Sequence, residues 1–158
     1  MPTAYIALGA NLGDPVFTVN AAFEAISKLP QTQLMATSAL YRTAPVGITE
    51  QPEFINAAAR VETRLAPEAL LDALLAVEQQ FGRVRELRNG PRTLDLDVLL
   101  YDDLVLDTPR LTLPHPRLHL RAFVLYPLAD VGPELRIPGR GTLAAWLPAV
   151  ANQGIVRL

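Results

Sequence analysis

Strand and helix patterns alternate along this chain in the order β-α-β-β-α-β. The strand patterns are residues 4–9, 34–41, 54–63 and 93–101. Helices are predicted to begin at Asp14-Pro15 and Pro67-Glu68, because each proline suits a first helical turn and apolar residues follow at helical spacing. This order is that of the split βαβ unit, so we predict an α+β, ferredoxin-like fold with a four-stranded antiparallel sheet and both helices on one face. The other face of the sheet is then left for a ligand.

The remaining segments are predicted to be loops, a C-terminal hairpin and short helices. Residues 42–52 and 83–92 are too rich in proline, glycine or charge for regular structure. The hairpin is expected after the Asp102-Asp103 turn, and short helices are expected over residues 121–128 and 142–147. A doubly wound Rossmann sheet is the competing fold, but the glycine-containing run after the first strand has neither the G-x-G-x-x-G spacing nor a Walker loop.

Composition limits the class of protein. We interpret residues 1–158 as a single domain, and a hydrophobic content of 50% argues against disorder. The net charge is −2, and the uncharged run at residues 141–156 is interrupted by Pro148 and polar amides, so no membrane span is predicted. No cysteine is present, which excludes disulfides, thiol catalysis and cysteine-bound zinc. The N-terminus lacks the basic region of a signal peptide, so we expect a cytoplasmic protein.

The most specific chemical pattern is Asp95-Leu96-Asp97 within the last predicted strand. Side chains alternate along a strand, so the two carboxylates share one face and lie roughly 7 Å apart. The residues predicted to point into the core instead are Leu94, Leu96, Val98 and Leu100. Mg²⁺ is commonly held by one or two carboxylates together with substrate phosphates, so the pair suits a metal-dependent phosphate reaction. The alternative is the solvated polar face of an edge strand.

Arginines surround this strand in the sequence. They account for 13 of the 14 cations, and seven of them flank the strand as Arg83, Arg85, Arg88, Arg92, Arg110, Arg117 and Arg121. Guanidinium groups bind phosphate oxygens, so carboxylates and arginines together indicate metal-bound polyphosphate. The same arginines could instead form surface ion pairs with neighbouring acids, and the residues alone do not separate these alternatives. Glu78, late on the second helix, could reach a ligand or orient an arginine.

Three further side chains are candidates for ligand contacts. His115 lies between two prolines that restrict the backbone, and we predict that it donates a hydrogen bond to phosphate. His119 follows four residues later, but zinc is not expected because Pro116 disfavours a helix there and no H-E-x-x-H motif is present. Phe54 and Asn56 share one face of their strand, where an aromatic ring and an amide could read a flat heterocycle. A core phenylalanine beside an edge asparagine is the alternative.

Six stretches of the sequence carry a family resemblance. They are AYIALGANLG at residues 4–13, YRT at 41–43, FINAA at 54–58, GRVR at 82–85, GPRTLDLD at 90–97 and LPHPRLHLRAFV at 113–124. In these stretches the chain resembles the 6-hydroxymethyl-7,8-dihydropterin pyrophosphokinase family. The stretches span nearly the whole chain in the order found in the family, and GPRTLDLD is a signature of it.

The resemblance implies a ferredoxin-like fold and a defined reaction. The β,γ-pyrophosphoryl group of ATP passes to the hydroxymethyl oxygen of 6-hydroxymethyl-7,8-dihydropterin, giving AMP and the pterin diphosphate in tetrahydrofolate biosynthesis. Two Mg²⁺ ions on the ATP phosphates are implied as cofactors. ATP and the pterin are the implied partners, and neither nucleic acid nor a membrane is expected. We expect a monomer, although a sheet edge could pair in a dimer.

The resemblance also implies residue roles. The implied catalytic residues are Arg83, Arg92, Asp95 and Asp97, of which Asp95 and Asp97 are also the metal ligands. The implied ATP contacts are Leu71, Glu78, Arg85, Val98, Arg110, Thr112, His115 and Arg121. The implied pterin contacts are Gly9, Thr43, Ala44, Val46, Phe54, Asn56, Asp95 and Phe123. The segments 42–52 and 83–92 match parts of the chain that the family uses as mobile lids.

The sequence departs from well-known family members at three places. Ala44 stands where some members have a second proline, and Phe54 stands where they have tyrosine. Residues 86–91 lack a tryptophan that some members carry there, which bears on lid packing and not on the metal or phosphate groups. Two other functions remain open from the residues alone. One is a two-Mg²⁺ nucleotidyltransferase or polyphosphate hydrolase, and the other is a nucleotide-sensing module with no catalysis.

Overall fold

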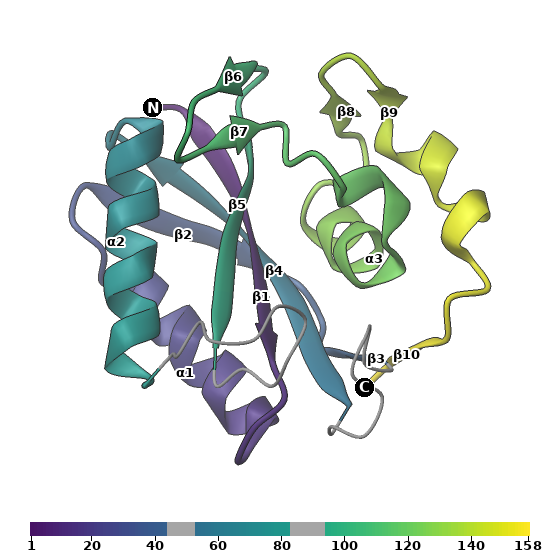
Figure 1. Ribbon diagram of the computed structural model, residues 1–158, viewed down its shortest axis with the longest axis horizontal. Coiled ribbons are helices and arrows are strands. Elements are labelled where there is room, and N and C mark those ends of the chain that lie inside the picture. Colours follow the sequence, from purple (N-terminus) through teal and green to yellow (C-terminus); the bar gives the residue numbers. More distant parts are fainter. Residues whose placement is uncertain (44–52, 83–93) are drawn as a thin grey trace.

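A large antiparallel sheet forms the centre of the protein (Figure 1). The computed structural model describes residues 1–43, 53–82 and 94–158. Its strands are β1 (Thr3–Ala10), β2 (Thr32–Thr37), β3 (Tyr41–Thr43), β4 (Phe54–Thr63), β5 (Asp95–Tyr101), β6 (Leu106–Asp107), β7 (Thr112–Leu113), β8 (Arg136–Ile137), β9 (Gly141–Thr142) and β10 (Ile155–Arg157). Its α-helices are α1 (Pro15–Ser27), α2 (Pro67–Gln80) and α3 (Ala122–Val131), and its 3-10 helices are η1 (Leu118–Leu120), η2 (Leu143–Trp146) and η3 (Pro148–Val150).

The strand order β5-β1-β4-β2 is that of the predicted split βαβ unit. The sheet is larger than the four strands expected, because β3 also pairs with β4 and β10 pairs with β3. The single strand predicted at residues 34–41 is divided into β2 and β3, which pair with different parts of β4: Thr37 is opposite Ala59, and Tyr41 is opposite Asn56. The ten-residue length of β4 allows it to serve both strands in succession.

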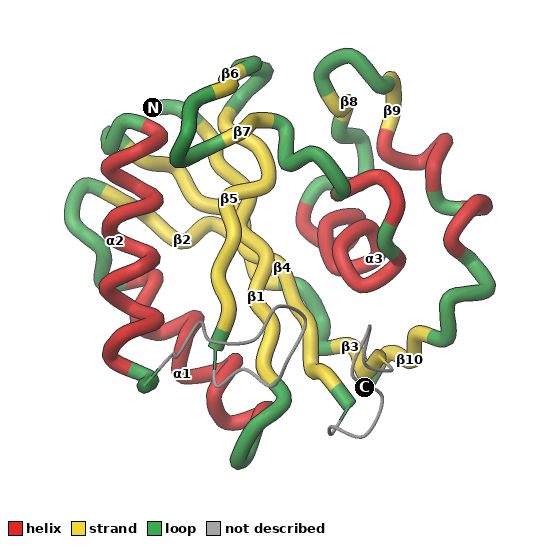
Figure 2. Tube along the Cα trace, viewed as in Figure 1, coloured by secondary structure: helices red, strands yellow, loops and turns green. Residues whose placement is uncertain are grey.

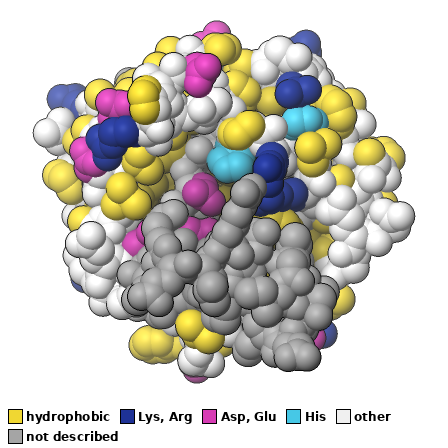
Figure 3. Space-filling view, in the orientation of Figure 1, with side chains coloured by type: hydrophobic (Ala, Val, Ile, Leu, Met, Phe, Trp, Pro, Cys, Tyr) yellow, Lys and Arg dark blue, Asp and Glu magenta, His cyan; other side chains and the backbone are white. Residues whose placement is uncertain are grey.

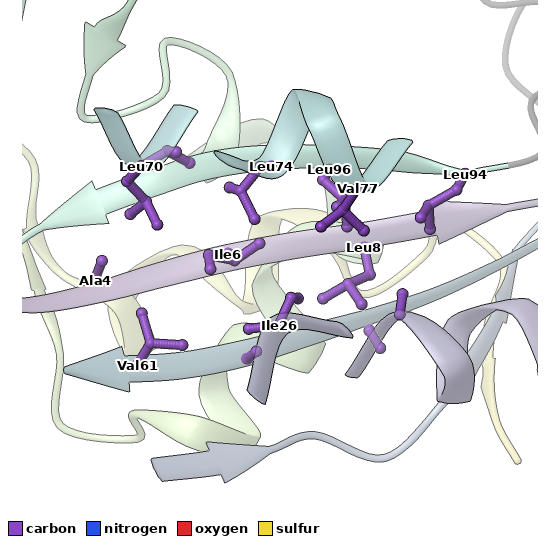
Figure 4. Close-up of a cluster of buried hydrophobic side chains, with 14 of the residues drawn as sticks. Ala4, Ile6, Leu8, Ile26, Val61, Leu70, Leu74, Val77, Leu94 and Leu96 are labelled. Atoms are coloured by element: carbon purple, nitrogen blue, oxygen red, sulfur yellow. The ribbon is translucent and has the colours of Figure 1, made fainter. Parts of the chain in front are cut away.

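Helices α1 and α2 cover one face of the sheet, as predicted. Helix α1 begins where the sequence indicated, and the side chain of Asp14 accepts a hydrogen bond from the backbone N–H of Phe17 at 3.1 Å. Figure 4 shows Leu70, Leu74 and Val77 of α2 directed at the strands, where they pack with Ile6 and Leu8 of β1 among other apolar side chains. Burial of the apolar faces of the two helices holds α1 against β1 and β4, and α2 against β5.

The opposite face of the sheet is not open, which corrects the expectation that it was left for a ligand. Helix α3 packs against it, mainly on β4, and the C-terminal segment lies on the outer side of α3 before β10 returns to pair with β3 (Figures 1 and 2). Leu125 and Leu128 of α3 share a second buried cluster with Tyr5 of β1 and Ala58 of β4. Helix α3 is apolar around most of its circumference, so it needs cover from both the sheet and the C-terminal segment. A ligand site on this face is therefore confined to the end of the sheet beyond α3.

An irregularity in β5 changes the direction of one predicted core residue. Leu94, Leu96 and Val98 point into the cluster beneath α2, as the alternation predicted. The register between β1 and β5 then shifts, because Ile6 is opposite Val98 whereas Tyr5 is opposite Leu100. Leu100 consequently lies in the second cluster, on the side of α3.

None of the helices in the described parts of the chain has the length and apolar content needed to cross a bilayer.

Candidate active site

Three strands place the central residues of the site side by side. In the register of the sheet, Gly9 of β1 lies opposite Asn56 of β4 on one side and opposite Asp95 of β5 on the other. A Cβ atom at residue 9 would lie 3.0 Å from Oδ1 of Asn56, so the absence of a side chain leaves room for this amide. Asn56 is held by a hydrogen bond of 2.9 Å from its Nδ2 to Oγ1 of Thr43. Because this bond orients the amide, Oδ1 is directed toward Gly9.

The first of two pockets lies over this end of the sheet and is bordered by the start of α3. Its lining residues are Ala7, Leu8, Gly9, Asn56, Asp95, Asp97, Leu99, His115, Arg121, Phe123 and Val124. We call it the amide pocket, after Asn56. The carbon Cζ of Arg121 lies 5.3 Å from the centre of the Phe123 ring, so a cation and an aromatic face adjoin at its wall.

The second pocket lies at the edge of the sheet, between α2 and the segment that contains β7. Its lining residues are Leu71, Leu75, Leu96, Asp97, Val98, Arg110, Leu111, Thr112, His115 and Pro116. We call it the edge pocket. Its volume of about 390 Å³ is within the range of small-molecule sites. Apolar side chains from α2 and β5 form one part of the wall, and polar groups at residues 110, 112 and 115 form another.

Asp97 and His115 line both pockets, so the two pockets meet at these side chains. In the space-filling view, acidic, histidine and basic side chains gather at the centre of this face (Figure 3). Asp95 belongs to the amide pocket and shares the face of β5 with Asp97, as the alternation predicted. A ligand in the amide pocket and a ligand in the edge pocket would therefore approach each other beside a carboxylate and an imidazole.

The imidazole of His115 is oriented from two directions. The backbone N–H of His115 donates to the carbonyl oxygen of Leu99 in β5 at 2.9 Å, which fixes the residue beside the strand. The backbone N–H of Arg117 donates to Nδ1 of His115 at 3.3 Å, so the neutral ring carries its proton on Nε2. Burial, followed by the charges of Arg121 and Arg117, lowers the pKa of His115, and Asp95 acts in the opposite direction. The lowered pKa favours the neutral ring, and in that ring Nε2 is the hydrogen-bond donor.

Glu78 lies behind β5 and lines neither pocket. Its side chain is 1% exposed, and Oε2 accepts a hydrogen bond of 2.7 Å from the backbone N–H of Leu96. Leu96 stands between Asp95 and Asp97, so Glu78 holds the strand that carries both carboxylates. The sequence identified Glu78 as a possible ligand contact or an aid to an arginine, and that interpretation stays a prediction. Within the described residues, Glu78 supports the strand.

The outer wall of the edge pocket is tied to α2 by polar contacts. Arg110 forms a hydrogen-bonded ion pair with Asp72, and this contact raises the pKa of the guanidinium. One residue pair nearby, Thr108 and Glu68, is joined by a hydrogen bond of 2.9 Å from Oγ1 to Oε1. Asp72 is exposed and Glu68 is half-buried on α2, and neither belongs to a sequence motif that would select it.

The structure brings most of the described candidates together. Leu71, Val98, Arg110, Thr112 and His115 line the edge pocket, whereas Gly9, Asn56, Asp95, Arg121 and Phe123 line the amide pocket. Thr43 contacts Asn56, and Phe54 is half-buried on β4, where it pairs with Thr43 in β3. The candidates Arg83, Arg85, Arg92, Ala44 and Val46 lie outside the described residues, as do residues 44–52 of the first predicted lid and all of the second. The prediction that residues 42–52 lack regular structure is wrong at its start, because Arg42 and Thr43 belong to β3 and pair with β4. The sequence missed the apolar wall residues Leu75, Leu111 and Pro116, which carry no chemical pattern of their own.

The described donor groups fit a metal ion that is shared with a phosphate ligand. Within the described residues no group of three or more His, Cys, Asp or Glu side chains is arranged to hold a metal by itself. Asp95 and Asp97 supply two carboxylates from one strand, which matches the few protein ligands that Mg²⁺ needs when phosphate oxygens complete its shell. His119 lies apart from this site, with its ring 4.8 Å from that of Trp146 in an edge-on contact.

Several known proteins are similar in sequence to this chain over most of its length. A family model described as 7,8-dihydro-6-hydroxymethylpterin-pyrophosphokinase (HPPK) matches residues 5–133. A Pseudomonas aeruginosa protein named 2-amino-4-hydroxy-6-hydroxymethyldihydropteridine pyrophosphokinase is 52% identical over 154 residues, which cover 98% of this chain and 95% of that protein. A Haemophilus influenzae protein of the same name is 44% identical over 158 residues, covering 100% of this chain and 99% of that protein.

Solved structures share its fold. A crystal structure of Plasmodium falciparum wild-type HPPK-DHPS with pteroate matches with a TM-score of 0.75 at 14% identity, covering 94% of this chain. This chain spans 42% of that longer protein, so the likeness concerns one part of it and shows the fold alone. The ferredoxin-like fold predicted from the sequence is confirmed. With the family model and the two bacterial relatives, these findings show that the chain belongs to the 7,8-dihydro-6-hydroxymethylpterin-pyrophosphokinase family.

Proposed function

We propose that the amide pocket and the edge pocket hold the two substrates of the family's reaction. The protein transfers pyrophosphate from ATP to hydroxymethyldihydropterin in folate synthesis, as its family and relatives do. The observation that carries the assignment of the pockets is that Asp97 and His115 line both of them. A transfer reaction needs its two substrates held in one reactive geometry, and adjoining pockets provide this.

The pterin is assigned to the amide pocket. Asn56 presents an amide oxygen that can accept hydrogen bonds from the amino and ring N–H groups of a pterin, because its Nδ2 is already bonded to Thr43. Phe123 supplies an aromatic face at the wall, and flat heterocycles stack on such faces. Gly9 keeps the floor of the pocket clear. Phe54, on the same face of β4 as Asn56, is proposed as a second aromatic contact.

ATP is assigned to the edge pocket. Leu71, Leu75 and Leu111 offer apolar contacts for the adenine ring, and they lie on the side of the pocket formed by α2 and the segment before β7. Arg110 and Thr112 supply donors for ribose or phosphate oxygens. His115 donates through Nε2 to phosphate, because its neutral ring uses Nδ1 for the backbone of Arg117. The charge on Arg110 remains available to phosphate alongside its pairing with Asp72.

Asp95 and Asp97 are proposed to hold two Mg²⁺ ions with the ATP phosphates. When bound, such ions would supply positive charge that offsets the negative charge developing in phosphoryl transfer. Asp97 lines both pockets at their junction, where the phosphates would lie, and Asp95 lines the adjoining amide pocket. Glu78 keeps the peptide between them in place through Leu96. Arg83, Arg85 and Arg92 are proposed as further phosphate contacts on the strength of the family pattern.

The transfer itself requires mainly positioning and charge compensation. The hydroxymethyl oxygen of the pterin forms a bond to the β-phosphorus of ATP, and the bond from that phosphorus to the oxygen bridging to the α-phosphorus breaks. AMP leaves with the bridging oxygen, and the hydroxyl proton passes to solvent. Asn56 and Phe123 orient the pterin, His115 and Arg121 orient the phosphates, and the pocket walls restrict water near the transferred group.

Nucleotide product analysis tests this function. The protein is incubated with ATP, Mg²⁺ and 6-hydroxymethyl-7,8-dihydropterin, and parallel samples omit the pterin or the metal. We expect AMP in the complete mixture only. ADP would indicate γ-phosphoryl transfer, and nucleotide hydrolysis without pterin would indicate a hydrolase; either outcome overturns the proposal. Asp97→Asn, which keeps the shape of the side chain and removes its charge, is expected to lower kcat by at least about 100-fold in a folded protein.

A further inference from the structure

The side chain of Gln153 bridges the two peptide groups that flank Arg121. Its Oε1 accepts a hydrogen bond of 2.9 Å from the backbone N–H of Ala122, and its Nε2 donates to the carbonyl oxygen of Leu120 at 3.0 Å. Arg121 lies between these residues and lines the amide pocket with both aspartates of β5. One amide from the C-terminal segment thus holds the main chain on each side of an active-site arginine.

This bridge replaces a cap that α3 does not have. Arg121 is the N-cap residue of α3, and its side chain makes no capping hydrogen bond. The first N–H groups of a helix have no partner within the helix, and a short polar side chain at the N-cap usually satisfies one of them. Arginine offers no acceptor atom, so it cannot do so. The acceptor for the N–H of Ala122 comes instead from Gln153, and the side chain of Arg121 extends along the pocket wall.

Gln153 is anchored on both sides, although it lies at the surface. Its backbone N–H donates to the carbonyl oxygen of Val150 at 3.2 Å, and Val150 is 2% exposed within the second buried cluster. After Gly154, whose φ of +73° turns the chain, Ile155 pairs with Thr43 in β3. The position of the amide is therefore set by the buried cluster and by the sheet together.

We propose that Gln153 is a positioning residue that directs Arg121 toward the transferred phosphates. It touches no reacting atom and acts by fixing the peptide planes on either side of Arg121, which set the direction in which that side chain leaves the backbone. The inference rests on the proposed function, because the direction of Arg121 matters for activity only if the pocket binds the substrates assigned to it.

Amide hydrogen exchange tests the bridge without any turnover. In the wild-type protein the amide of Ala122 is protected by Gln153, whereas the amide of Leu125 is protected by the carbonyl oxygen of Arg121 at 3.0 Å. In Gln153→Ala we expect exchange at Ala122 to be about tenfold faster or more, while exchange at Leu125 changes less than about twofold. Unchanged exchange at Ala122 would overturn the proposal whether or not the protein makes AMP.

A double-mutant cycle tests whether the bridge acts through Arg121. We expect Gln153→Ala to lower kcat/KM about tenfold, and to lower it less than about twofold when Arg121→Ala is already present. The loss should fall on kcat, with the KM for ATP within about twofold, since the apolar walls of the edge pocket are untouched. Equal losses in both backgrounds, or a change in the KM for ATP alone, would overturn the proposal.

Two further variants separate hydrogen bonding from packing. Gln153→Met keeps the length of the side chain but has no amide, and we expect it to lose as much activity as Gln153→Ala. Asn152→Ala, at the exposed neighbouring position, should behave as wild type. Wild-type activity in Gln153→Met would assign the effect to packing and overturn the proposal. If the wild-type protein itself forms no AMP, the proposed function fails, and the exchange experiment still decides whether the bridge exists.

Discussion

Glu78 and Leu96 are joined by a hydrogen bond of 2.7 Å from the backbone N–H of Leu96 to Oε2 of Glu78. Glu78 is buried, with 1% of its surface exposed. A carboxylate buried on α2 is thereby attached to the peptide group between the two aspartates of β5. The contact makes the geometry of Asp95 and Asp97 depend on a residue that lies 18 positions before Leu96 in the chain.

Glu78→Ala is expected to destabilise the protein and to weaken metal use. Removing the acceptor leaves the N–H of Leu96 unsatisfied, which lowers the free energy of unfolding by about 1–3 kcal/mol. The Mg²⁺ concentration at half-maximal rate should rise several-fold, because β5 is no longer held at this point. Urea unfolding and a Mg²⁺ titration of AMP formation measure the two effects. Glu78→Gln keeps an acceptor and should lose less, and Gln79→Ala, an exposed neighbour on α2, is the control. Wild-type stability and Mg²⁺ response in Glu78→Ala would contradict this role.

Gly9→Ala is expected to impair pterin binding selectively. The added Cβ would lie 3.0 Å from Oδ1 of Asn56, so the amide must move from the position in which Thr43 holds it. We expect the affinity for the pterin to fall about tenfold, as for the loss of one well-placed hydrogen bond. Affinity for a non-hydrolysable ATP analogue in the same variant should stay within about twofold. Calorimetric titration measures both values. Pterin affinity equal to that of the wild type would show that Asn56 does not form hydrogen bonds to the pterin.

His119→Phe is expected to reduce the loss of stability in acid. His119 is 5% exposed, and burial together with the charge of Arg140 lowers its pKa. The unfolded chain therefore binds a proton at His119 below its ordinary pKa of about 6.5 while the folded protein does not, and stability falls as the pH decreases through that range. Phenylalanine preserves a ring against Trp146 and removes the titration. Urea unfolding at pH 7.5 and pH 5.0 should show a smaller decrease in the variant. His115 is present in both proteins, so its contribution cancels, and equal decreases would exclude His119 as a contributor.

Tyr41→Phe is expected to remove a stability loss at high pH. The hydroxyl of Tyr41 donates to Oδ2 of Asp130 at 2.8 Å, and burial, this hydrogen bond and the charge of Asp130 raise the pKa of Tyr41 to about 12. Between about pH 10 and pH 12 the unfolded chain has lost this proton while the folded protein keeps it, so stability declines as the pH rises. The decline between pH 9 and pH 11, measured by urea unfolding, should be smaller in the variant. A decline as steep as that of the wild type would assign the alkaline sensitivity to other groups.

Much of the fold could be predicted because its signals are local. The start of α1 depends on Asp14 and Pro15, which cap and orient the first turn that follows them in the chain. The alternation in Asp95-Leu96-Asp97 likewise depends only on strand geometry, and both carboxylates face the amide pocket as expected. The bulge that turned Leu100 to the other face was not predictable in this way, because it arises from the register of β5 against β1.

The candidate site was predictable residue by residue but not as an arrangement. His115 and Asn56 were identified from the residues around them and from the family resemblance, and Phe123 was identified from the resemblance alone. Their arrangement with Asp97 around the amide pocket, and the junction of the two pockets at Asp97 and His115, follow from the register of three strands and from the position of α3. Leu75 and Leu111 carry no signal beyond being apolar, so only packing reveals that they line a pocket and not the core.

The sequence by itself determined the family, the order of strands and helices, and the residue types that carry the chemistry. Each of these depends on motifs and periodicities within short stretches of chain. The tertiary structure decided that α3 covers the second face of the sheet and that Glu78 supports the strand of the aspartates. It also decided that the side chain of Gln153 bonds to the main chain on both sides of Arg121. These contacts join residues 18 or more positions apart, and such contacts form only when the buried surfaces of separate elements pack together, which no local pattern encodes.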